Sequence, residues 1–510
     1  MKRFIFFFFF FLMGAQQWAS AQKISYSPLI KEDNQDINFE ILGKIGNNYV
    51  VYKKVRWKHM LQVFNTDMTQ RSNERMSYIP DKVLNVDFVT YPDHFYMIFQ
   101  YQRNSNVFCK AVKINSEGER ISEVMMLDST RVGLLNDSRI YNLSYSEDKQ
   151  KILLYKLHKK SGDLNIVTKR YDAELNQLDS LRQTLDFNER RDVYSDFQIS
   201  DKGTIVFAHQ RKAGNRENIN NLEVVTCRAG DTGFVPHPIA LNGNYIDEVQ
   251  IKIDNVNDNF LINSLYFTEK RGSVVGLFAT ILNSSDLQTK LVFLNFSDSI
   301  RNKISNSGEY RYAFDNIFIR NLFLKRDGGY ILILEDFSSQ NRGNNGWNRW
   351  DYLYGNPYGY SDYYMFNRYR QYGFYNPYYY GRNAFSSTRY YYDNLLVLGI
   401  DSSLSLNWEQ IIFKKQADED NDYFLSFTTM NSGAEIHFLF IEKERRAQVI
   451  SNQSINSHGK ITRYATLKSR ENGYLYMPRL GKQVGIRQMI IPCLYRDNVS
   501  FAKIDFSEPN

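Results

Sequence analysis

Short apolar runs recur in groups of four along most of this chain, and tight polar turns separate them. The clearest group begins with the alternating run Ile317–Phe323, which the turn Arg326–Gly329 and the continuous apolar run Tyr330–Leu334 follow. Asn394–Ile400 and Trp408–Phe413 complete the group. Short runs of this kind, bounded by Gly, Asp, Asn and Ser, predict β-strands joined by hairpins.

The same order of strands recurs about eight times. Second strands of the groups, such as Ile152–Tyr155, are apolar on both faces and therefore need a sheet on each side. We expect first strands to start near Phe39, Leu84, Ile140, Val193, Val249, Ile317, Tyr423 and Tyr474, and second strands near Tyr49, Phe95, Ile152, Ile205, Phe260, Tyr330, Ile436 and Met489.

A ring of four-stranded sheets, each stacked between two others, buries both faces of every second strand. The sequence therefore predicts an all-β fold, a β-propeller of eight four-stranded blades, with seven blades as the close alternative. Two β-sandwich or barrel domains would also give evenly spaced strands. No Pro/Ser-rich stretch or charge block separates the groups as a linker would.

The N-terminus has the pattern of an export signal. Lys2 and Arg3 precede the apolar run Phe4–Met13, and Ala19–Ala21 provides a small-x-small cleavage site. The run is shorter than the roughly 20 residues that span a bilayer. We expect residues 1–22 to be a signal peptide and 23–510 to be one propeller domain. The mature chain would be soluble, without a transmembrane segment, in the periplasm or outside the cell.

The last group ends near Phe506 with three strands, one fewer than the others. Ile24–Pro28 is a spare short strand next to the signal. Because an open ring would leave an unpaired sheet edge, we predict that this segment completes the last blade and joins the two ends of the chain. A loose N-terminal tail is the alternative.

Composition limits the chemistry. The formal net charge of +7 is mild, which argues against a dedicated nucleic-acid binder. Cys109, Cys227 and Cys493 fall in predicted strands far apart in sequence, so we expect buried free thiols, with one disulfide as the alternative. No zinc, phosphate-loop or nucleophile-elbow motif is present, and we expect no cofactor and no metal.

Two turns are similar to known repeat motifs. Asp327–Tyr330 looks like a turn common in bacterial propeller repeats, and Ser200–Thr204 echoes the Asp box of sialidases without its completing aromatic residue. On this pattern, which covers the whole mature chain, the sequence resembles secreted bacterial β-propeller repeat proteins in general. The resemblance implies a ring of blades and specifies no activity.

Cations gather in the predicted loops between second and third strands, and acids gather in the opposite turns. The loop cations are Lys53, Lys54, Arg56, Lys58, Arg103, Lys156, Lys159, Lys160, Arg211, Lys212, Arg216, Lys270, Arg271, Lys443, Arg445, Arg446 and Arg496, against the acids Asp163, Glu217, Glu269, Glu442, Glu444 and Asp497. The opposite turns carry Asp67, Asp93, Glu117, Glu119, Asp148, Asp172, Glu174, Asp201, Asp231, Asp258, Asp286, Asp327 and Asp401.

If these loops share one face, that face would attract an anionic partner. We take Lys159, Lys160, Arg211 and Lys212 as candidate binding residues. The alternative is that Asp is simply favoured in tight turns and that the lysines and arginines are solvated charges.

Residues 338–393 interrupt the sixth group with a segment dense in Tyr, Asn, Gly and Arg. Its aromatic rings suit sugar stacking or a protein interface. The alternative is a disordered low-complexity loop. A third hypothesis, stacking on single-stranded bases, is less consistent with the export signal. The candidate binding residues here are Trp347, Trp350, Tyr352, Tyr354, Tyr358, Tyr360, Tyr363, Tyr364, Arg368, Arg370, Tyr378, Tyr379 and Tyr380.

These observations favour an exported, non-catalytic binding or scaffold propeller that recognises an anionic or glycan ligand or another envelope protein. The alternative is a carbohydrate-active hydrolase or lyase, which would need two carboxylates about 5–10 Å apart in a pocket. The acids in or near predicted inner strands are Asp87, Asp196, Glu335 and Asp336.

Overall fold

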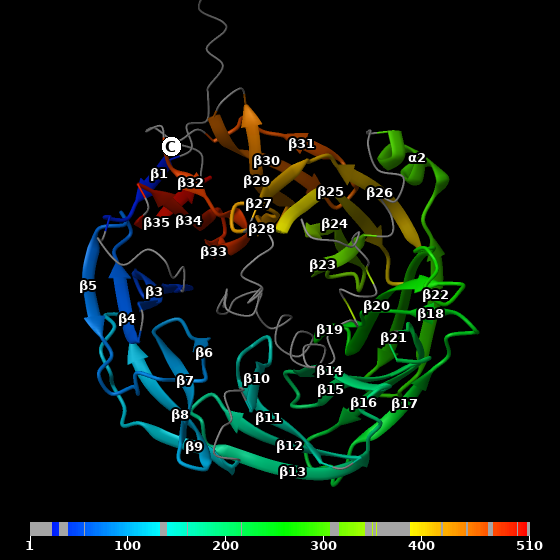
Figure 1. Cartoon of the computed structure of the whole chain (residues 1–510), viewed down its shortest axis with the longest axis horizontal. Helices are drawn as coiled ribbons and strands as arrows, with labels where there is room; N and C mark the ends of the chain where they lie inside the picture. The colour runs from blue at the N-terminus through cyan, green and yellow to red at the C-terminus, as the bar shows by residue number, and fades with distance from the viewer. Residues whose placement is uncertain are drawn as a thin grey trace, which may run out of the picture.

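The computed structural model describes residues 23–29, 39–55, 57–132, 140–160, 162–215, 217–306, 316–341, 349, 353, 388–419, 422–444, 447–467, 473–496 and 498–506. The described chain is almost entirely antiparallel β-structure. Its sheets lie side by side in a circle, and the strands within a sheet, such as β6 to β9, follow one another from the middle to the rim (Figure 1). This is a repeated-blade β-propeller fold.

Four sheets contain four strands each, paired in chain order. They are β2 Phe39–Ile45, β3 Asn48–Val55, β4 Lys58–Phe64 and β5 Gln70–Arg75; β6 Asn85–Thr90, β7 His94–Arg103, β8 Asn106–Asn115 and β9 Met125–Arg131; β10 Tyr141–Tyr145, β11 Lys151–Lys160, β12 Asp163–Asp172 and β13 Gln177–Asp186; and β28 Phe427–Asn431, β29 Glu435–Glu444, β30 Ala447–Asn456 and β31 Ile461–Arg463.

The other sheets are larger. A nine-stranded sheet contains β14 Asp192–Ile199, β15 Ile205–Lys212, β16 Ile219–Cys227, β17 Val235–Ile239, β18 Tyr245–Ile246, β19 Gln250–Asp254, β20 Asn259–Phe267, β21 Gly276–Asn283 and β22 Thr289–Asn295. Two five-stranded sheets contain β23 Ile317–Leu324, β24 Tyr330–Asn341, β25 Thr388–Ile400, β26 Leu406–Ile412 and β27 Gln416–Glu419; and β1 Lys23–Tyr26, β32 Leu475–Tyr476, β33 Lys482–Gly485, β34 Gln488–Tyr495 and β35 Asn498–Asp505. Helix α2 spans Asp298–Asn306, and the 3-10 helix η3 spans Pro478–Leu480.

Every predicted second strand is a strand of the structure, because its two apolar faces are buried by different neighbours. In β24, Leu332 and Leu334 join a core cluster with residues of β20 and β21. Ile331 and Ile333 join another cluster with residues of β29 and β30. Each such burial contributes about 1.5–3 kcal/mol, so the stacking of sheets against one another is the main source of stability.

Two first strands differ from the prediction. β28 begins at Phe427 rather than near Tyr423, because a turn closed by the Leu425 amide on the Asp422 carbonyl precedes it. The first strand of the last sheet is divided into β32 and β33 by η3, which begins at Pro478. Proline has no backbone N–H to give to a ladder, so a strand breaks there.

The segment after the predicted signal pairs with the last strand. β1 lies antiparallel to β35, with Ile24 opposite Ile504. Ser27 continues the contact: its hydroxyl accepts the amide of Phe501 at 3.0 Å, and its carbonyl accepts the hydroxyl of Ser500 at 3.0 Å. Cys109, Cys227 and Cys493 are buried free thiols, as expected.

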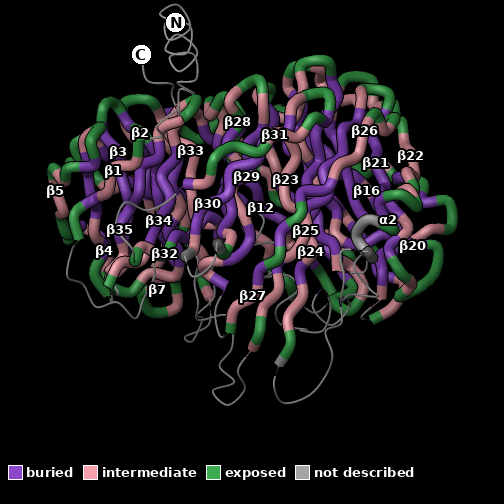
Figure 2. The backbone as a smooth tube through the Cα atoms, turned by 90° about the horizontal axis from the view of Figure 1, so that it is seen from above, coloured by how far each residue is buried: buried purple, intermediate pink, exposed green. Residues whose placement is uncertain are grey.

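The hairpins define two faces of the ring. The connections between second and third strands, such as β24–β25, lie on the face from which β27 projects (Figure 2). We call this the insertion face, and we call the face that carries the tight turns, such as Arg326–Gly329, the turn face. The charged loops of the sequence thus separate onto two faces.

Ser27→Ala tests the contribution of the first strand. The variant removes an acceptor for the buried Phe501 amide, which should cost about 1–2 kcal/mol, and we expect a lower thermal midpoint. Ser25→Ala, two residues earlier on β1 and at a half-buried position, is the control. Equal midpoints for both variants would contradict a stabilising role for this contact.

Candidate functional site

The segment predicted as an insertion leaves the ring on a β-ribbon. β24 runs to Asn341 and β25 begins at Thr388, so both strands extend into the predicted range 338–393. β27 pairs with β25 at Arg389–Tyr392 and adds a third strand to the ribbon. Between Asn341 and Thr388 the structure describes Arg349 and Leu353. The candidates Trp347, Trp350, Tyr352, Tyr354, Tyr358, Tyr360, Tyr363, Tyr364, Arg368, Arg370, Tyr378, Tyr379 and Tyr380 lie outside the described residues.

A register shift at the base of the ribbon gathers carboxylates. Glu335 pairs with Leu395 and Phe337 with Tyr392, so Asp336 alone faces both Asp393 and Asn394. Such a bulge turns side chains away from the regular alternation of a strand. Three acids of two adjacent strands therefore meet at the point where the ribbon leaves the sheet.

Glu335 is completely buried and fully paired. Its carboxylate lies 2.7 Å from the ammonium of Lys414 and 3.1 Å from Nε of Arg320. The hydroxyl of Ser426, on the approach to β28, donates to it at 2.8 Å. Because this buried carboxylate already pairs with Lys414 and Arg320 of its own sheet and accepts the Ser426 hydroxyl from the neighbouring side, it serves a structural role and is not placed to react with a ligand.

Asp336 is in a different electrostatic situation. Burial, and then repulsion from Asp393, raise the pKa of its carboxyl to about 8, although Lys414 opposes the shift. Burial also raises the pKa of Asp393, against the attraction of Lys414. Acids with raised pKa values are found at functional sites as well as in structural clusters, and both residues keep partial contact with solvent.

Tyr392 completes the cluster beside the carboxylates. Its ring centroid lies 6.0 Å from Arg320, 5.9 Å from the Lys414 ammonium and 5.6 Å from Arg479. Its hydroxyl donates to Asp422 at 2.6 Å, and the Arg479 guanidinium pairs with the same carboxylate. The base of the ribbon is thus tied to the sheets on the β28 and β34 side.

The other two candidate acids lie elsewhere. Asp87, on β6, accepts a hydrogen bond from the amide of Asn85 at 2.6 Å. Asp196, on β14, is buried and accepts the backbone amide of Ile251. Both carboxylates have structural partners, and only Glu335 and Asp336 of the four belong to one cluster.

The candidate cations divide into exposed and buried groups. Lys159 is exposed, with its ammonium 5.1 Å from the centroid of the Phe187 ring. Arg211 is exposed and pairs with Asp192 at 3.5 Å. Lys212 is buried, and its burial followed by repulsion from Lys159 lowers its pKa. The side chain of Lys160 lies outside the described residues.

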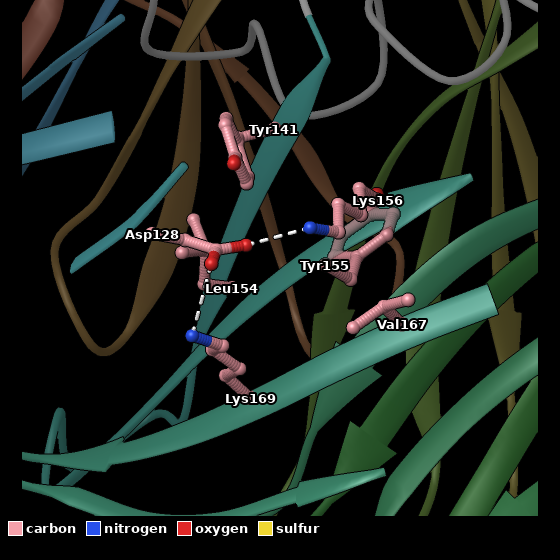
Figure 3. Close-up of a pocket in the computed structure, with 7 residues that line it drawn as sticks. All are labelled: Asp128, Tyr141, Leu154, Tyr155, Lys156, Val167 and Lys169. Carbon is pink, nitrogen blue, oxygen red and sulfur yellow. Dashed lines mark hydrogen bonds and ion pairs between the residues drawn. The ribbon is translucent and has the colours of Figure 1, made fainter. Parts of the chain in front are cut away.

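A small recess lies between β9 and β11 (Figure 3). Asp128 pairs there with Lys156 at 2.7 Å and with Lys169 at 3.1 Å, over the ring of Tyr141. The recess has no room for a water molecule. It is a packed ion-pair seam between two sheets rather than a ligand site.

Asp393, Lys414 and Arg320 were not singled out by the sequence. Arg320 lies on the apolar strand β23, Asp393 lies on β25 and Lys414 follows β26, so strand pairing within one sheet and the bulge in β24 bring them to Glu335. The signal that existed was the pair Glu335–Asp336 at the end of an otherwise apolar strand, where charges are costly unless paired.

Comparison with known proteins identifies no relative by sequence: no protein family and no curated protein matches the chain. Similar solved structures include prolyl oligopeptidase B from Galerina marginata (8% identity, TM-score 0.40, 94% of this chain and 56% of that one). Others are the dihydro-heme d1 dehydrogenase NirN (10%, 0.37, 95% and 76%) and an ulvan lyase of polysaccharide lyase family PL25 (10%, 0.34, 81% and 90%).

These neighbours are all-β, propeller-like proteins. The chain spans just over half the length of the prolyl oligopeptidase that it matches. Likenesses this weak transfer no activity. Within the described part of the chain, no helix is long and apolar enough to cross a membrane, and no group of three or more His, Cys, Asp or Glu side chains is arranged to hold a metal ion.

Asp336→Asn should change how stability depends on pH. The carboxyl has a pKa of about 8 in the folded protein and of about 3.9 in an unfolded chain. The folded state therefore holds the extra proton between these values, and stability falls as pH rises through that window. We expect the thermal midpoint of the variant to exceed that of the wild type by about 2–5 °C at pH 8.5, with a smaller difference at pH 5.

Glu419→Gln, which removes an exposed charge from the same ribbon, is the control and should show no such pH-dependent gain. A constant difference between Asp336→Asn and the wild type from pH 5 to 8.5 would contradict a raised pKa at Asp336.

Glu335→Gln should be strongly destabilising, because it leaves the buried Lys414 ammonium and Arg320 without their carboxylate. Breaking a buried pair in this way costs about 3–5 kcal/mol, and we expect the thermal midpoint to fall by about 5 °C. Combining it with Lys414→Met should recover much of the loss. If the double variant is no more stable than Glu335→Gln alone, the pair is not coupled as the contacts indicate.

Proposed function

We propose that this protein is an exported, non-catalytic propeller that binds an anionic surface glycan through its insertion face. The observation that supports the proposal is that exposed cations lie at hairpin ends on the same face as the ribbon of β24, β25 and β27, whose strands lead into the aromatic-rich part of the sequence. An envelope protein is the other partner that the sequence allows, and the experiment below separates the two.

Exposed cations support the proposal. They occur at the hairpins between second and third strands on the insertion face: Lys58, Arg103, Lys159, Arg211, Lys270, Arg271, Lys443 and Arg496 are exposed there, against the exposed acids Asp163 and Glu269 of the same hairpins and Glu419 of the ribbon. Arg56, Arg216, Arg445 and Arg446 lie outside the described residues. A surface with this excess of cations would speed the association of a polyanion, and the binding would weaken as the salt concentration rises.

Exposed aromatic groups accompany the cations. Trp57, at the β3–β4 connection, is 60% exposed, with the Lys54 ammonium 5.9 Å from its ring. Arg389 lies 5.4 Å from the ring of Tyr391 on the ribbon. Rings of this kind stack on sugars while a neighbouring cation pairs with a carboxylate or sulfate group.

Within the proposal, the ring has eight blades, because the nine-stranded sheet divides naturally into β14–β17 and β19–β22, with β18 as a bridge between them. β1 closes the ring by completing the last blade. A closed ring gives a rigid platform on which several weak sites can act on one polymer, and such multivalency raises avidity without any single deep pocket.

A hydrolase or lyase that acts on a carbohydrate is the second candidate. The raised pKa of Asp336 beside Asp393 favours it, since a protonated acid and a neighbouring carboxylate are the parts that glycoside cleavage needs. Glu335 is too fully paired to take part. The test is whether a polysaccharide that binds is also shortened, and whether Asp336→Asn abolishes the shortening.

The binding experiment compares the mature protein on immobilised dextran sulfate, polygalacturonate and neutral dextran. In one variant, residues 354–387 are replaced by a Gly/Ser linker, which retains both strands of the ribbon, Arg349 and Leu353. A second variant reverses four exposed cations of the insertion face, Lys58, Arg103, Lys159 and Lys443, to Glu. We expect both variants to lose at least 10-fold in affinity for the polyanions.

The matched control reverses four exposed cations of the turn face, Lys44, Lys290, Arg326 and Lys460, to Glu, so that the net charge changes equally. This control should keep most of the affinity. Equal losses in both reversal variants would show a nonspecific charge effect. No binding to either polyanion by the wild type would rule out the glycan proposal and leave the envelope protein as the partner to seek.

A further inference from the structure

A histidine lies between two carboxylates on β15. Nδ1 of His209 lies 2.7 Å from Oε2 of Glu223 on β16, and Nε2 lies 3.6 Å from Oδ1 of Asp192 on β14. The His209 ring stacks on the ring of Tyr194, with centroids 4.4 Å apart and planes at 8°. Strand pairing sets this arrangement, because Tyr194 and Glu223 are the cross-strand neighbours of His209 in the two ladders.

The same oxygen of Asp192 also faces an arginine. Arg211 is the cross-strand neighbour of Asp192, and its Nε lies 3.5 Å from Oδ1. The other oxygen, Oδ2, accepts the backbone amide of Asn188 at 2.8 Å. The side chain of Asp192 is 9% exposed and that of Arg211 is 48% exposed. Oδ1 therefore lies between His209, within the sheet, and Arg211, at the surface.

The gap between His209 and Asp192 is that of two acceptors. A neutral imidazole that donates from Nδ1 to Glu223 carries a lone pair on Nε2, and that lone pair faces the Asp192 carboxylate. Within the described part of the chain, neither Nε2 of His209 nor Oδ1 of Asp192 has a hydrogen-bond partner, although both atoms are buried. A proton on Nε2 would turn this contact of 3.6 Å into a charge-assisted hydrogen bond.

The surrounding charges favour a proton on this ring. Burial disfavours the imidazolium, but Asp192 and Glu223 outweigh burial and raise the pKa of His209 above its usual value of 6.5. On the side of β13, Asp186 belongs to the same environment: burial first, and then Asp192, Glu223 and Asp186, raise the pKa of Tyr194. A histidine in such a setting changes its charge near neutral pH.

The cluster borders a junction of cations on the insertion face. The ammonium of Lys159, on β11, lies 5.1 Å from the centroid of the Phe187 ring, which lies 6.2 Å from that of Tyr194. After burial, repulsion from Lys159 lowers the pKa of Lys212. Arg211 precedes Lys212, so cations of two adjacent sheets gather where β11 and β15 pack together. Such a gathering of like charges attracts an oxyanion.

The proton on His209 changes the charge behind Arg211. With a neutral ring, the carboxylates of Asp192 and Glu223 outweigh the single charge of Arg211, which stays attracted to Asp192. With a protonated ring, His209 pairs with both carboxylates, and the charges of the four side chains cancel. The Arg211 guanidinium is then available to a ligand, and the attraction for an anion in solvent rises.

We propose that Arg211, with Lys159 beside it, forms an oxyanion subsite of the insertion face, and that a proton-dependent contact between His209 and Asp192 controls it. The group that the subsite takes is a carboxylate or a sulfate of the bound polymer. The ligand half of this proposal rests on the proposed function, whereas the contact between His209 and Asp192 forms without a ligand. Arg211 contacts the ligand, and His209 is a positioning residue that acts through Asp192.

NMR titration of the histidine rings tests the contact without a ligand. In protein labelled at the histidine Cε1 position, the signal that His209→Gln removes identifies the His209 ring. We expect this ring to titrate above the ordinary histidine pKa of about 6.5. Asp192→Asn should lower the titration midpoint, because it removes one of the two carboxylates that stabilise the imidazolium.

Glu419→Gln is the matched control for Asp192→Asn, because it also replaces a carboxylate by an amide, at an exposed position of the ribbon. It should leave the His209 titration unchanged. A His209 ring that titrates at or below 6.5, or equal midpoints in Asp192→Asn and the wild type, would overturn the contact.

Binding to immobilised dextran sulfate and polygalacturonate at pH 6 and pH 8.5 tests the subsite. We expect the affinity of the wild type to rise about 5-fold from pH 8.5 to pH 6 at low salt. In His209→Gln, whose side chain stays neutral, the rise should be less than half as large. His458→Gln removes an exposed histidine from the turn face and should retain the wild-type rise.

Arg211→Gln and Asp192→Asn separate the subsite from its control. Arg211→Gln, at an exposed position, should lose several-fold in affinity at pH 6 and most of the pH dependence. Asp192→Asn should gain affinity at pH 8.5, and by more than Glu419→Gln, which changes the net charge equally. Wild-type pH dependence in both His209→Gln and Arg211→Gln would overturn the subsite. If the wild type binds neither polyanion, the proposed function fails, while the NMR titration still decides whether His209 and Asp192 form the contact.

Discussion

The structure depends on central strands whose two faces are both apolar. A strand such as β24, with Leu332 and Leu334 on one face and Ile331 and Ile333 on the other, cannot rest in a sheet that meets water on one side. It needs a sheet on each side, and so does the corresponding strand of every neighbour. Repetition of this requirement along the chain places the sheets side by side, in the circular arrangement that Figure 1 shows.

Ion pairs favour one arrangement of the strands at the base of the ribbon, where the fold departs most from the four-stranded repeat. At the base of the ribbon, Glu335 joins Lys414 and Arg320, and Arg479 joins Asp422. Such buried ion pairs add little net stability compared with apolar packing, but they penalise every arrangement that leaves one partner alone. They therefore fix the register of the sheets around the segment that departs most from the repeat.

The hydrogen-bond and ion-pair partners of each acid distinguish structural carboxylates from those that remain candidates for chemistry. Glu335, Asp87 and Asp196 have partners that account for their burial, whereas Asp336 and Asp393 repel each other and keep contact with solvent. The exposed cations of the insertion face and the acid pair thus occur on the same side of the molecule, at the base of the ribbon. Arg349 pairs with Asp247 beside the sheet that carries the ribbon.

The sequence alone located the second strand of every group and most of the first strands, since apolar periodicity and turn residues act over a few neighbouring positions. It located β24 and the spare strand that pairs with β35, and it marked Glu335 and Asp336 as unusual. It did not find Asp393, Lys414 or the partner of Arg349, and it did not show that Lys212 is buried. Those depend on a bulge and on contacts between segments as far apart as Asp247 and Arg349, and only the packing of sheet against sheet decides which side chains meet across such distances.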